Sequence, residues 1–467
     1  MSDRSAVVWT RATGSPRRLG LLLRSDKAIR FTYDEASSDL PGISLVHDTT
    51  RTAGHTLEFR PTEENRLPPM FQALIPPADS ANLQRRILTH LIEKSGDRIS
   101  NPADLEWRML VLAGRNGIGH LDVFSSDEAA AGYYAEQVDP VVFDNEELAE
   151  RPLWNLVINA ISPTADPLTI EEVAERIKAQ PSVGGMMPKL LAKIRRSNGQ
   201  IVDALVKIEP REYPGILALE DLAYEMHSRI GIPIPRRRLY VSGDGVRILA
   251  TERFDRRDGR PVPMESAFTA LYCATAGRIG QRWSNEGASP SLEDVTKLIE
   301  HSITGVSAAP ASDIRELFRR TVMSLLTGNG DNHLENHAFL GSRGSAGLSP
   351  LYDPAPMRGY HRHQMVSSLA FGGMVFRQGS IPSDLGEGVL RFAASIGLQK
   401  RVALGEIERC LEATTDFAVM ASRVEDRGVG PDLVGRIEGI RYRIERLVSG
   451  RRNIRANRVF EPIGRRS

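Results

Sequence analysis

The sequence predicts an α+β chain in three parts: a β-rich N-terminal region, a small β-rich lobe and a large helical lobe. Short β-like runs separated by Gly, Pro and charged turns fill the first 33 residues. Paired β-like runs flank a single helical pattern between residues 190 and 254, and beyond Pro263 the pattern is helical almost throughout. We therefore expect an N-terminal accessory domain at 1–148, a small lobe at 149–262 and a helical lobe at 263–467.

The composition is that of a globular protein. With 467 residues, 41% hydrophobic and 25% charged, the chain can bury two or three ordinary cores. A formal charge of +1 argues against a dedicated nucleic-acid or membrane binder. Cys273 and Cys410 are the only cysteines, which gives no disulfide framework or cysteine metal site. No apolar run approaches the ~20 residues of a membrane span, and the N-terminus lacks a signal-peptide core, so we expect a cytoplasmic protein without membrane contact.

The N-terminal region predicts a small antiparallel sheet from the runs at 6–9, 19–23 and 29–33. Residues 80–95 predict a helix, because Leu83, Ile87 and Leu91 recur on one face. Residues 107–111 and 117–123 are interpreted as two more strands around a Gly-Arg-Asn-Gly turn. Nothing in this region indicates catalysis.

The small lobe carries a glycine pair followed by lysines. Ser182-Val-Gly184-Gly185 leads to Lys189 and to two predicted strands, 190–194 and 203–208, joined by a Ser-Asn-Gly turn. Glycines let the backbone approach phosphates, and Lys207 in the second strand can bind them by charge. A solvated strand lysine is the alternative for Lys207, and no Walker A loop is present.

A predicted helix at 216–230 follows and carries Glu220 near its start. This glutamate can pair with Lys207, or it can be an ordinary first-turn acid favoured by the helix dipole. Two strands are predicted at 237–241 and 246–254. The second ends in Glu252-Arg-Phe254-Asp-Arg256, whose backbone is a candidate hinge for an adenine base. Helices are also predicted in the first part of this lobe, at 153–161 and 169–179.

The stretch from Thr327 to Asp353 carries the chemistry. An amphipathic helix ends at Gly328, so that Asp331, Asn332 and His333 lie on a loop; two short strands, 337–340 and 348–352, then lead to Asp353 at the end of a hairpin. Phosphoryl transfer needs one carboxylate to accept the proton of a hydroxyl, and oxygen ligands for Mg²⁺. Asp331, Asn336 and Asp353 offer this set, and with the preceding small lobe they predict a bilobal protein-kinase-like fold.

Two alternatives apply to this stretch. Asp331 and Asn336 can be turn residues, with Asp353 capping a strand end. A zinc hydrolase is the second alternative, but the clustered histidines do not form the His-Glu-x-x-His pattern; they are His333, His337, His361 and His363.

Taken together, these motifs resemble the HipA family of serine/threonine kinases, the toxins of bacterial toxin–antitoxin pairs. The matching elements span roughly residues 180 to 370: Ser182-x-x-Gly185-x-x-x-Lys189, Lys207, Glu220 with Gly231-Ile-Pro-Ile-Pro, Glu252-Arg-Phe-Asp-Arg256, Gly330-Asp-Asn-His333-x-x-Asn336 and Leu348-x-Pro-Leu-Tyr-Asp353. The stretch Gly117-Ile-Gly-His-Leu is similar, more weakly, to the end of the family's N-terminal domain.

The resemblance implies ATP and Mg²⁺ as cofactors and assigns roles to named residues. Asp331 becomes the catalytic base, and His333 and Asn336 are the other catalytic residues of its motif. Asn336 and Asp353 become the metal ligands, and Ser182 becomes an autophosphorylation site whose modification inactivates the enzyme. The implied nucleotide-binding set is Gly184, Gly185, Lys189, Lys207, Glu220, Glu252, Phe254, Asp331, Asn336 and Asp353.

The resemblance also implies partners. They are a protein substrate, for which an aminoacyl-tRNA synthetase is a candidate, and a small helix-turn-helix antitoxin through which DNA is reached only indirectly. Two departures stand out: Met187 replaces a usual Gln, and the region before Trp107 is longer than the family pattern. The alternative function is a non-catalytic kinase fold that binds an antitoxin or acts as a DNA co-repressor, which an arginine-rich tail keeps open.

Overall fold

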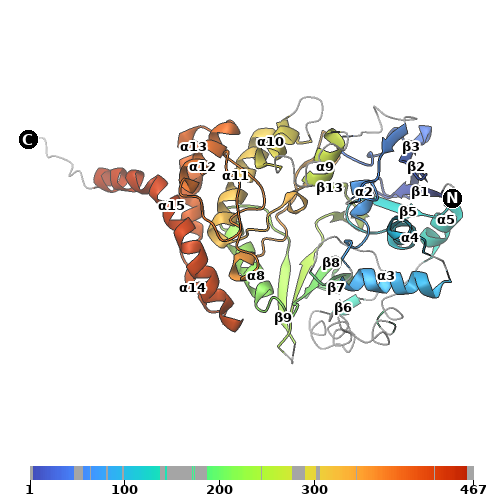
Figure 1. Ribbon diagram of the computed structural model, residues 1–467, viewed down its shortest axis with the longest axis horizontal. Helices are drawn as coiled ribbons and strands as arrows, with labels where there is room; N and C mark the ends of the chain where they lie inside the picture. The colour runs from blue at the N-terminus through green and yellow to red at the C-terminus, as the bar shows by residue number, and fades with distance from the viewer. Residues whose placement is uncertain are drawn as a thin grey trace, which may run out of the picture.

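The computed structural model describes residues 4–46, 56–136, 142–144, 171, 173, 187–275, 290–300 and 306–459, with short internal gaps at 64, 80–81, 97–98, 243–244, 343 and 425. The expected α+β layout is confirmed. Figure 1 shows the N-terminal sheet at one end of the long axis, the helical lobe at the other, and the small lobe between them.

The N-terminal sheet has five antiparallel strands in the order β4-β3-β2-β1-β5. They are β1 (Arg4–Thr10), β2 (Arg17–Arg24), β3 (Ile29–Tyr33), β4 (Thr56–Phe59) and β5 (Leu121–Phe124). The expected strands at the start of the chain are therefore confirmed. The associated helices are η1 (Glu35–Ser37), α2 (Pro69–Gln72), α3 (Leu83–Lys94), α4 (Pro102–Ala113) and α5 (Asp127–Ala135).

One expected strand is wrong, because residues 107–111 lie inside α4. The side chain of Asn101 caps this helix by accepting a hydrogen bond from the Asp104 amide at 2.9 Å, and Pro102 occupies the first turn. Trp107 and Leu110 are buried one turn apart on its inner face. A short apolar run of this length does not distinguish a strand from a buried helix turn, and the cap at Asn101 was the missed signal.

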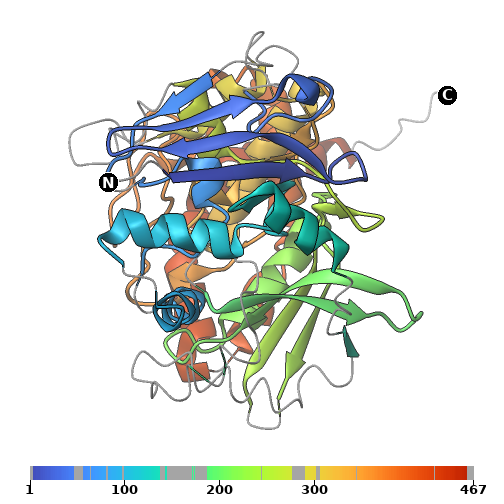
Figure 2. The same ribbon diagram turned by 90° about the vertical axis from the view of Figure 1, so that its right-hand side faces the viewer.

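Helix α3 joins the N-terminal sheet to the small lobe. Leu88 and Ile92 pack in the core beneath the N-terminal sheet, whereas Leu83 and Ile87 pack against the small-lobe strands. Figure 2 shows the strands of the N-terminal sheet in blue above, the green small-lobe sheet below, and the helices between them. The two β-rich parts are therefore packed through shared helices.

The small-lobe sheet has the order β6-β7-β8-β10-β9, in which only β6 runs parallel to its neighbour. Its strands are β6 (Val142–Asp144), β7 (Lys189–Arg195), β8 (Ile201–Ile208), β9 (Arg237–Val241) and β10 (Arg247–Glu252), and α8 (Ile216–Ser228) packs on it. Because β6 pairs with β7, this sheet includes chain from before the expected boundary at 148. The helices expected at 153–161 and 169–179 fall outside the described residues, except for Glu171 and Val173, which are helical.

The helical lobe surrounds α11 (Pro310–Thr327), which ends at Gly328 as expected. Gly328 has a φ of +82°, and a Cβ there would lie 2.6 Å from a methyl carbon of Leu433, so both backbone and packing require glycine. The other helices are α9 (Ala267–Ala274), α10 (Leu292–Glu300), η2 (Leu334–Asn336), η3 (Met357–Gly359), α12 (Leu385–Ser395), α13 (Lys400–Ala413), α14 (Phe417–Ser422), η4 (Asp426–Gly428) and α15 (Val429–Val459).

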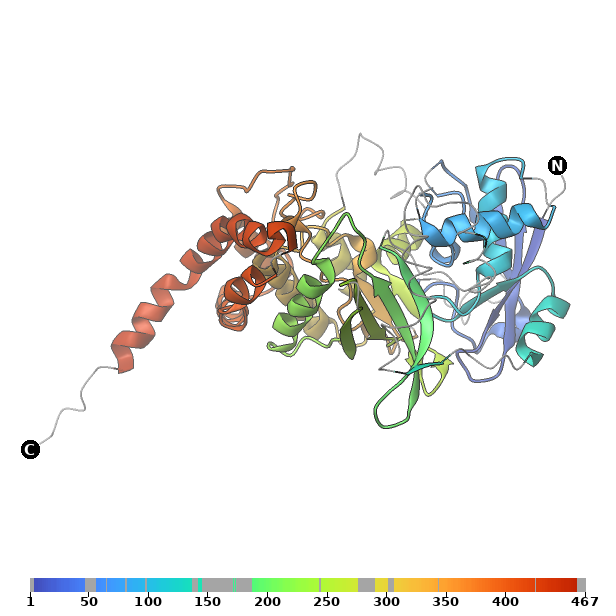
Figure 3. The ribbon, with the colours of Figure 1, turned by 90° about the horizontal axis from the view of Figure 1, so that it is seen from below.

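Two small sheets complete the fold. The hairpin β11 (Arg256–Arg257) and β12 (Arg260–Pro261) is followed by β13 (Met264–Ser266), β14 (Ala338–Leu340) and β15 (Gly347–Leu348). The end of α15 extends away from the body (Figure 3). Among the described helices, none is long and apolar enough to cross a bilayer.

A buried charge network ties the N-terminal region to the small lobe at Asp255. Its carboxylate, 4% exposed, accepts hydrogen bonds from Arg253 at 2.7 Å, from Arg256 at 3.0 Å and from the Gly119 amide at 2.9 Å. The two guanidinium groups also donate to the Gly117 carbonyl. Burial alone would raise the pKa of Asp255, but the two arginines lower it below its usual value, so the carboxyl stays ionised.

We expect Asp255→Asn to lower the free energy of unfolding by about 3–5 kcal/mol, because it leaves two buried guanidinium groups without their counter-charge. Urea denaturation measures the change. Asp258→Asn is the matched control, since Asp258 is exposed in the same hairpin and its φ of +51° suits asparagine. Equal losses in the two variants would contradict the network's role.

Candidate functional site

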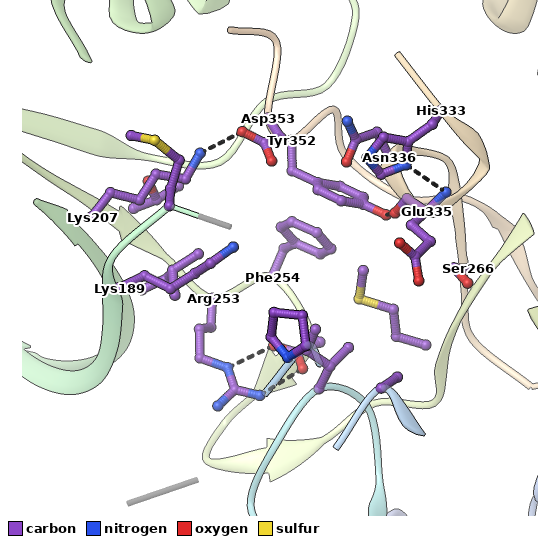
Figure 4. A pocket seen from close by; sticks show the side chains of 18 of the residues that line it. Lys189, Lys207, Arg253, Phe254, Ser266, His333, Glu335, Asn336, Tyr352 and Asp353 are labelled. Carbon is purple, nitrogen blue, oxygen red and sulfur yellow. Dashed lines mark hydrogen bonds and ion pairs between the residues drawn. The ribbon is translucent and has the colours of Figure 1, made fainter. Parts of the chain in front are cut away.

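A cavity of about 730 Å³ opens between the small lobe, the helical lobe and the N-terminal region. It brings together nine of the residues singled out in the sequence, several of which Figure 4 shows: Lys189, Lys207, Glu220, Glu252, Phe254, Asp331, His333, Asn336 and Asp353. Ser182, Gly184 and Gly185 lie outside the described residues.

Lys207 lies at the centre of the cavity's charges. Its Nζ is 2.6 Å from Oε1 of Glu220 and 2.7 Å from Oδ1 of Asp353. The expected pairing of Lys207 with Glu220 is therefore confirmed. Burial, at 3% exposure, would lower the pKa of Lys207, but the two carboxylates raise it above its ordinary value, and the ammonium stays charged.

Asp353 adopts an unusual backbone conformation, with a φ of +56°. Its amide donates to the Tyr224 hydroxyl at 3.1 Å, and its carboxylate points into the cavity (Figure 4). Burial opposes ionisation, but Lys207 and Lys189 bring the pKa of Asp353 down to about 2. A strained aspartate held ionised beside a cavity is typical of a functional position.

Asp353 was expected to follow directly on a hairpin strand at 348–352, but the strand that forms is shorter and ends before Asp353. Strand β15 ends at Leu348, and the last ladder bond is that of the Ser349 amide to the Ala338 carbonyl, at 2.8 Å. Pro350 has no N–H to continue the ladder, so the chain reaches Asp353 as an irregular segment.

Lys189, the first residue of β7, is a buried cation. It is 8% exposed, and within the described part of the chain no side chain or backbone group forms a hydrogen bond or ion pair with its ammonium. Burial lowers its pKa to about 8, although Asp353 partly offsets this. Its amine points into the cavity in Figure 4, where an anionic ligand would add to the negative charge of Asp353.

The loop after α11 is closed through the backbone of Asp331. The Asp331 carbonyl accepts hydrogen bonds from the His333 amide at 2.9 Å and from Nδ2 of Asn336 at 3.0 Å. The carboxylate of Asp331 has no hydrogen-bond partner among the described residues and opens to the cavity. Partial loss of solvation raises the pKa of Asp331 above its usual value. The Asp353 carboxylate raises this pKa further, whereas positive charge on His333 and His363 lowers it. Asp331 is thus available as a base.

Asn336 and Asp353 fit a magnesium ion. Because Nδ2 of Asn336 is used within the loop, its Oδ1 remains for a cation, and the ionised Asp353 supplies a second hard oxygen ligand. His333 accepts a hydrogen bond from the Glu335 amide at 3.2 Å through Nδ1, and so caps η2. The described histidines and acids form no group of three that holds a metal, so the zinc alternative gains no support.

The part of the cavity beside residues 252–254 is aromatic. The rings of Phe254 and Tyr352 lie 5.9 Å apart between centroids. The Glu252 carboxylate is ion-paired to Arg196, with Nε–Oε1 at 2.5 Å, and the Glu252 and Arg253 amides donate to the Arg236 and Asp203 carbonyls, both at 2.8 Å. The expected hinge at 252–254 stays a candidate, but these groups are already engaged within the protein.

Sequence reasoning missed three residues that build the site. Tyr224 lies one helical turn after Glu220 on the same face of α8, which was a usable signal. Asn329 joins both loops by accepting from the Asp331 amide at 3.2 Å and donating to the Asp353 carbonyl at 3.5 Å. The Tyr352 hydroxyl donates a hydrogen bond to the Glu335 carbonyl, and no local sequence pattern predicts this contact.

The family model described as "HipA-like C-terminal domain" matches residues 181–417, just over half of the chain. The chain belongs to this family. The resemblance stated from the sequence is thereby confirmed, and the matched range contains every site residue discussed above.

Two curated relatives of this HipA-like chain are named as kinases. A "Putative kinase" of Haemophilus influenzae is 25% identical over 249 residues, which cover 48% of this chain and 70% of the relative. "Putative kinase Y4mE" of Sinorhizobium fredii is 26% identical over 160 residues, 33% of this chain and 36% of the relative. The chain thus matches only about a third of the second relative.

A solved structure has the same overall fold. It is the Shewanella oneidensis HipA of a complex with HipB and operator DNA, which aligns with a TM-score of 0.57 at 18% identity, over 92% of this chain and 96% of that one. At this identity the likeness shows the fold alone, and it confirms the expected bilobal kinase-like architecture.

We expect ATP affinity to fall as the pH rises through about 8, by up to about tenfold per pH unit, because bound phosphate favours the charged form of Lys189 and binding then takes up a proton. Calorimetry across pH 7–9 measures this dependence. Lys189→Met should abolish it, whereas Lys193→Met on the same strand should not, since Lys193 pairs with Asp203 at 3.2 Å. A profile that is unchanged in Lys189→Met would contradict the assignment.

Proposed function

We propose that the chain is a protein kinase that transfers the γ-phosphate of ATP, with Mg²⁺, to a serine or threonine hydroxyl of a protein. The observation that carries this proposal is Lys207 held between Glu220 and Asp353. In protein kinases a lysine–glutamate ion pair and a metal-binding aspartate must both be in place for transfer.

Each group in the cavity has a task in this reaction. Asn336 and Asp353 would hold Mg²⁺, which neutralises charge on the phosphates when it is bound. Lys189 and Lys207 would bind phosphate oxygens, and the backbone at 252–254 would meet the base. Asp331, with its free carboxylate and raised pKa, orients the acceptor hydroxyl and accepts its proton.

We expect Asp331→Asn to slow phosphoryl transfer by about 10²- to 10⁴-fold while ATP still binds, because the variant loses the base and not the phosphate ligands. ADP formation by the full chain, with casein as a protein acceptor, measures the rate. Glu335→Gln removes a carboxylate from the same loop and separates loss of the base from loss of local negative charge. Near wild-type turnover in Asp331→Asn would remove Asp331 from the mechanism.

Autophosphorylation at Ser182 is proposed as the off-switch. Ser182 precedes Gly184 and Gly185, and a phosphate there adds about −1.5 to −2 charges beside the phosphates of ATP. Repulsion would then displace the glycine stretch and weaken ATP binding. Mass spectrometry of the ATP-treated chain tests this: phosphate only at other residues, or a Ser182-phosphorylated form with normal ATP affinity, would contradict it.

We also propose a small helix-turn-helix antitoxin as partner, with DNA contacted only through it and a protein such as an aminoacyl-tRNA synthetase as acceptor. The solved HipA bound to HipB and operator DNA supports the first part. Purification of the tagged chain together with the product of its neighbouring reading frame tests it, and the absence of a complex would count against this partner.

A further inference from the structure

The segment 354–366, which follows Asp353, lies directly on the loop that carries Asp331. A Cβ on Gly330 would be 2.0 Å from the Met365 carbonyl oxygen, so no other residue fits at this position without movement. The Arg358 amide also donates to the Gly328 carbonyl at 3.1 Å. The place of Asp331 therefore depends on where segment 354–366 is held.

The small lobe holds this segment through an aromatic contact. The Tyr213 hydroxyl lies 2.8 Å from Nε2 of His363, and their ring centroids are 5.4 Å apart. Tyr360 packs edge-on against Tyr213 at 5.1 Å and donates its hydroxyl to the Pro214 carbonyl at 2.8 Å. Either the Tyr213 hydroxyl or the imidazole can donate this hydrogen bond, depending on which ring nitrogen of His363 carries the proton.

Only part of this contact faces the cavity. Tyr213 and His363 line it together with Asp331, whereas Tyr360 does not. A positive charge on His363 acts to lower the pKa of Asp331, and the Asp331 carboxylate acts to raise that of Tyr213, so the three groups are electrostatic neighbours. The charges that act on Lys189 come instead from Asp353, Lys207, Glu220 and Glu335. The Tyr213–His363 pair thus lies on the Asp331 side of the cavity, which the acceptor must reach.

We propose that Tyr213 and His363 are positioning residues for phosphoryl transfer: their hydrogen bond holds segment 354–366 against the Asp331 loop at the face where the acceptor hydroxyl enters. This inference rests on the proposed kinase function. In many protein kinases a phosphate on the segment after the metal-binding aspartate fixes that segment through arginines. Here the Tyr213–His363 contact joins the segment to the loop that leads into α8, so the segment is held without a phosphate.

Tyr213→Phe removes one hydroxyl and keeps the ring packing. We expect kcat for ADP formation, with casein as acceptor, to fall by about fivefold to a hundredfold. The lower figure corresponds to the loss of one hydrogen bond, and the upper figure to displacement of the catalytic base. The Kd for ATP with Mg²⁺ should not change. Tyr134→Phe is the matched control, because it removes a hydroxyl that donates to Asp122 at 2.8 Å in the N-terminal region and does not line the cavity; it should leave kcat near the wild-type value.

Substitutions at His363 supply the second measurement. His363→Gln keeps an amide that can bond the Tyr213 hydroxyl, so it should retain more of kcat than His363→Leu, which cannot. Equal kcat in the two His363 variants, or a Tyr213→Phe variant no slower than Tyr134→Phe, would overturn the inference while wild-type turnover still supports a kinase. Absence of ATP turnover in the wild type would instead overturn the proposed function.

Discussion

The burial of Lys207 between two carboxylates is the constraint on which the rest of the site depends. A cation at 3% exposure is stable only with counter-charge at hydrogen-bond distance, and Glu220 and Asp353 supply it from α8 and from the segment beyond β15. One ammonium therefore fixes a sheet, a helix and a loop relative to one another. The same arrangement keeps Asp353 ionised, and its carboxylate also acts on Lys189, a second buried cation at the cavity.

The N-terminal region is part of this arrangement. Asp255 ties Gly119 to the residues beside the candidate hinge. Glu265 in β13 accepts hydrogen bonds from the Ser44 hydroxyl and the Leu45 amide, both at 2.7 Å, and β13 pairs with β14, which follows the Asp331 loop. Residues 41–45 line the cavity as well. The N-terminal region therefore forms part of the cavity wall.

The sequence predicts the local parts of the site well and the long-range parts poorly. Gly328 and the periodicity of α11 predict where the Asp331 loop begins, and the lysine strand followed by a helix predicts the Lys207–Glu220 pair. Residues 107–111 were misassigned because a short apolar run suits both a strand and a buried helix turn. Tyr213 and His363 are 150 residues apart in the sequence. No local sequence pattern around either residue predicts contact with the other, so the contact is seen only in the folded chain.

The central claim is that Asp353, held by Lys207, is set to bind a metal ion together with a nucleotide. Titration of ATP into the wild-type chain and into Asp353→Ala, each with Mg²⁺ and with EDTA, tests it most directly. We expect wild-type affinity to fall sharply when Mg²⁺ is removed, because the ion neutralises phosphate charge through this carboxylate, and we expect Asp353→Ala to lose that dependence. Equal metal dependence in the two proteins, or ATP binding by the wild type that ignores Mg²⁺, would contradict the claim.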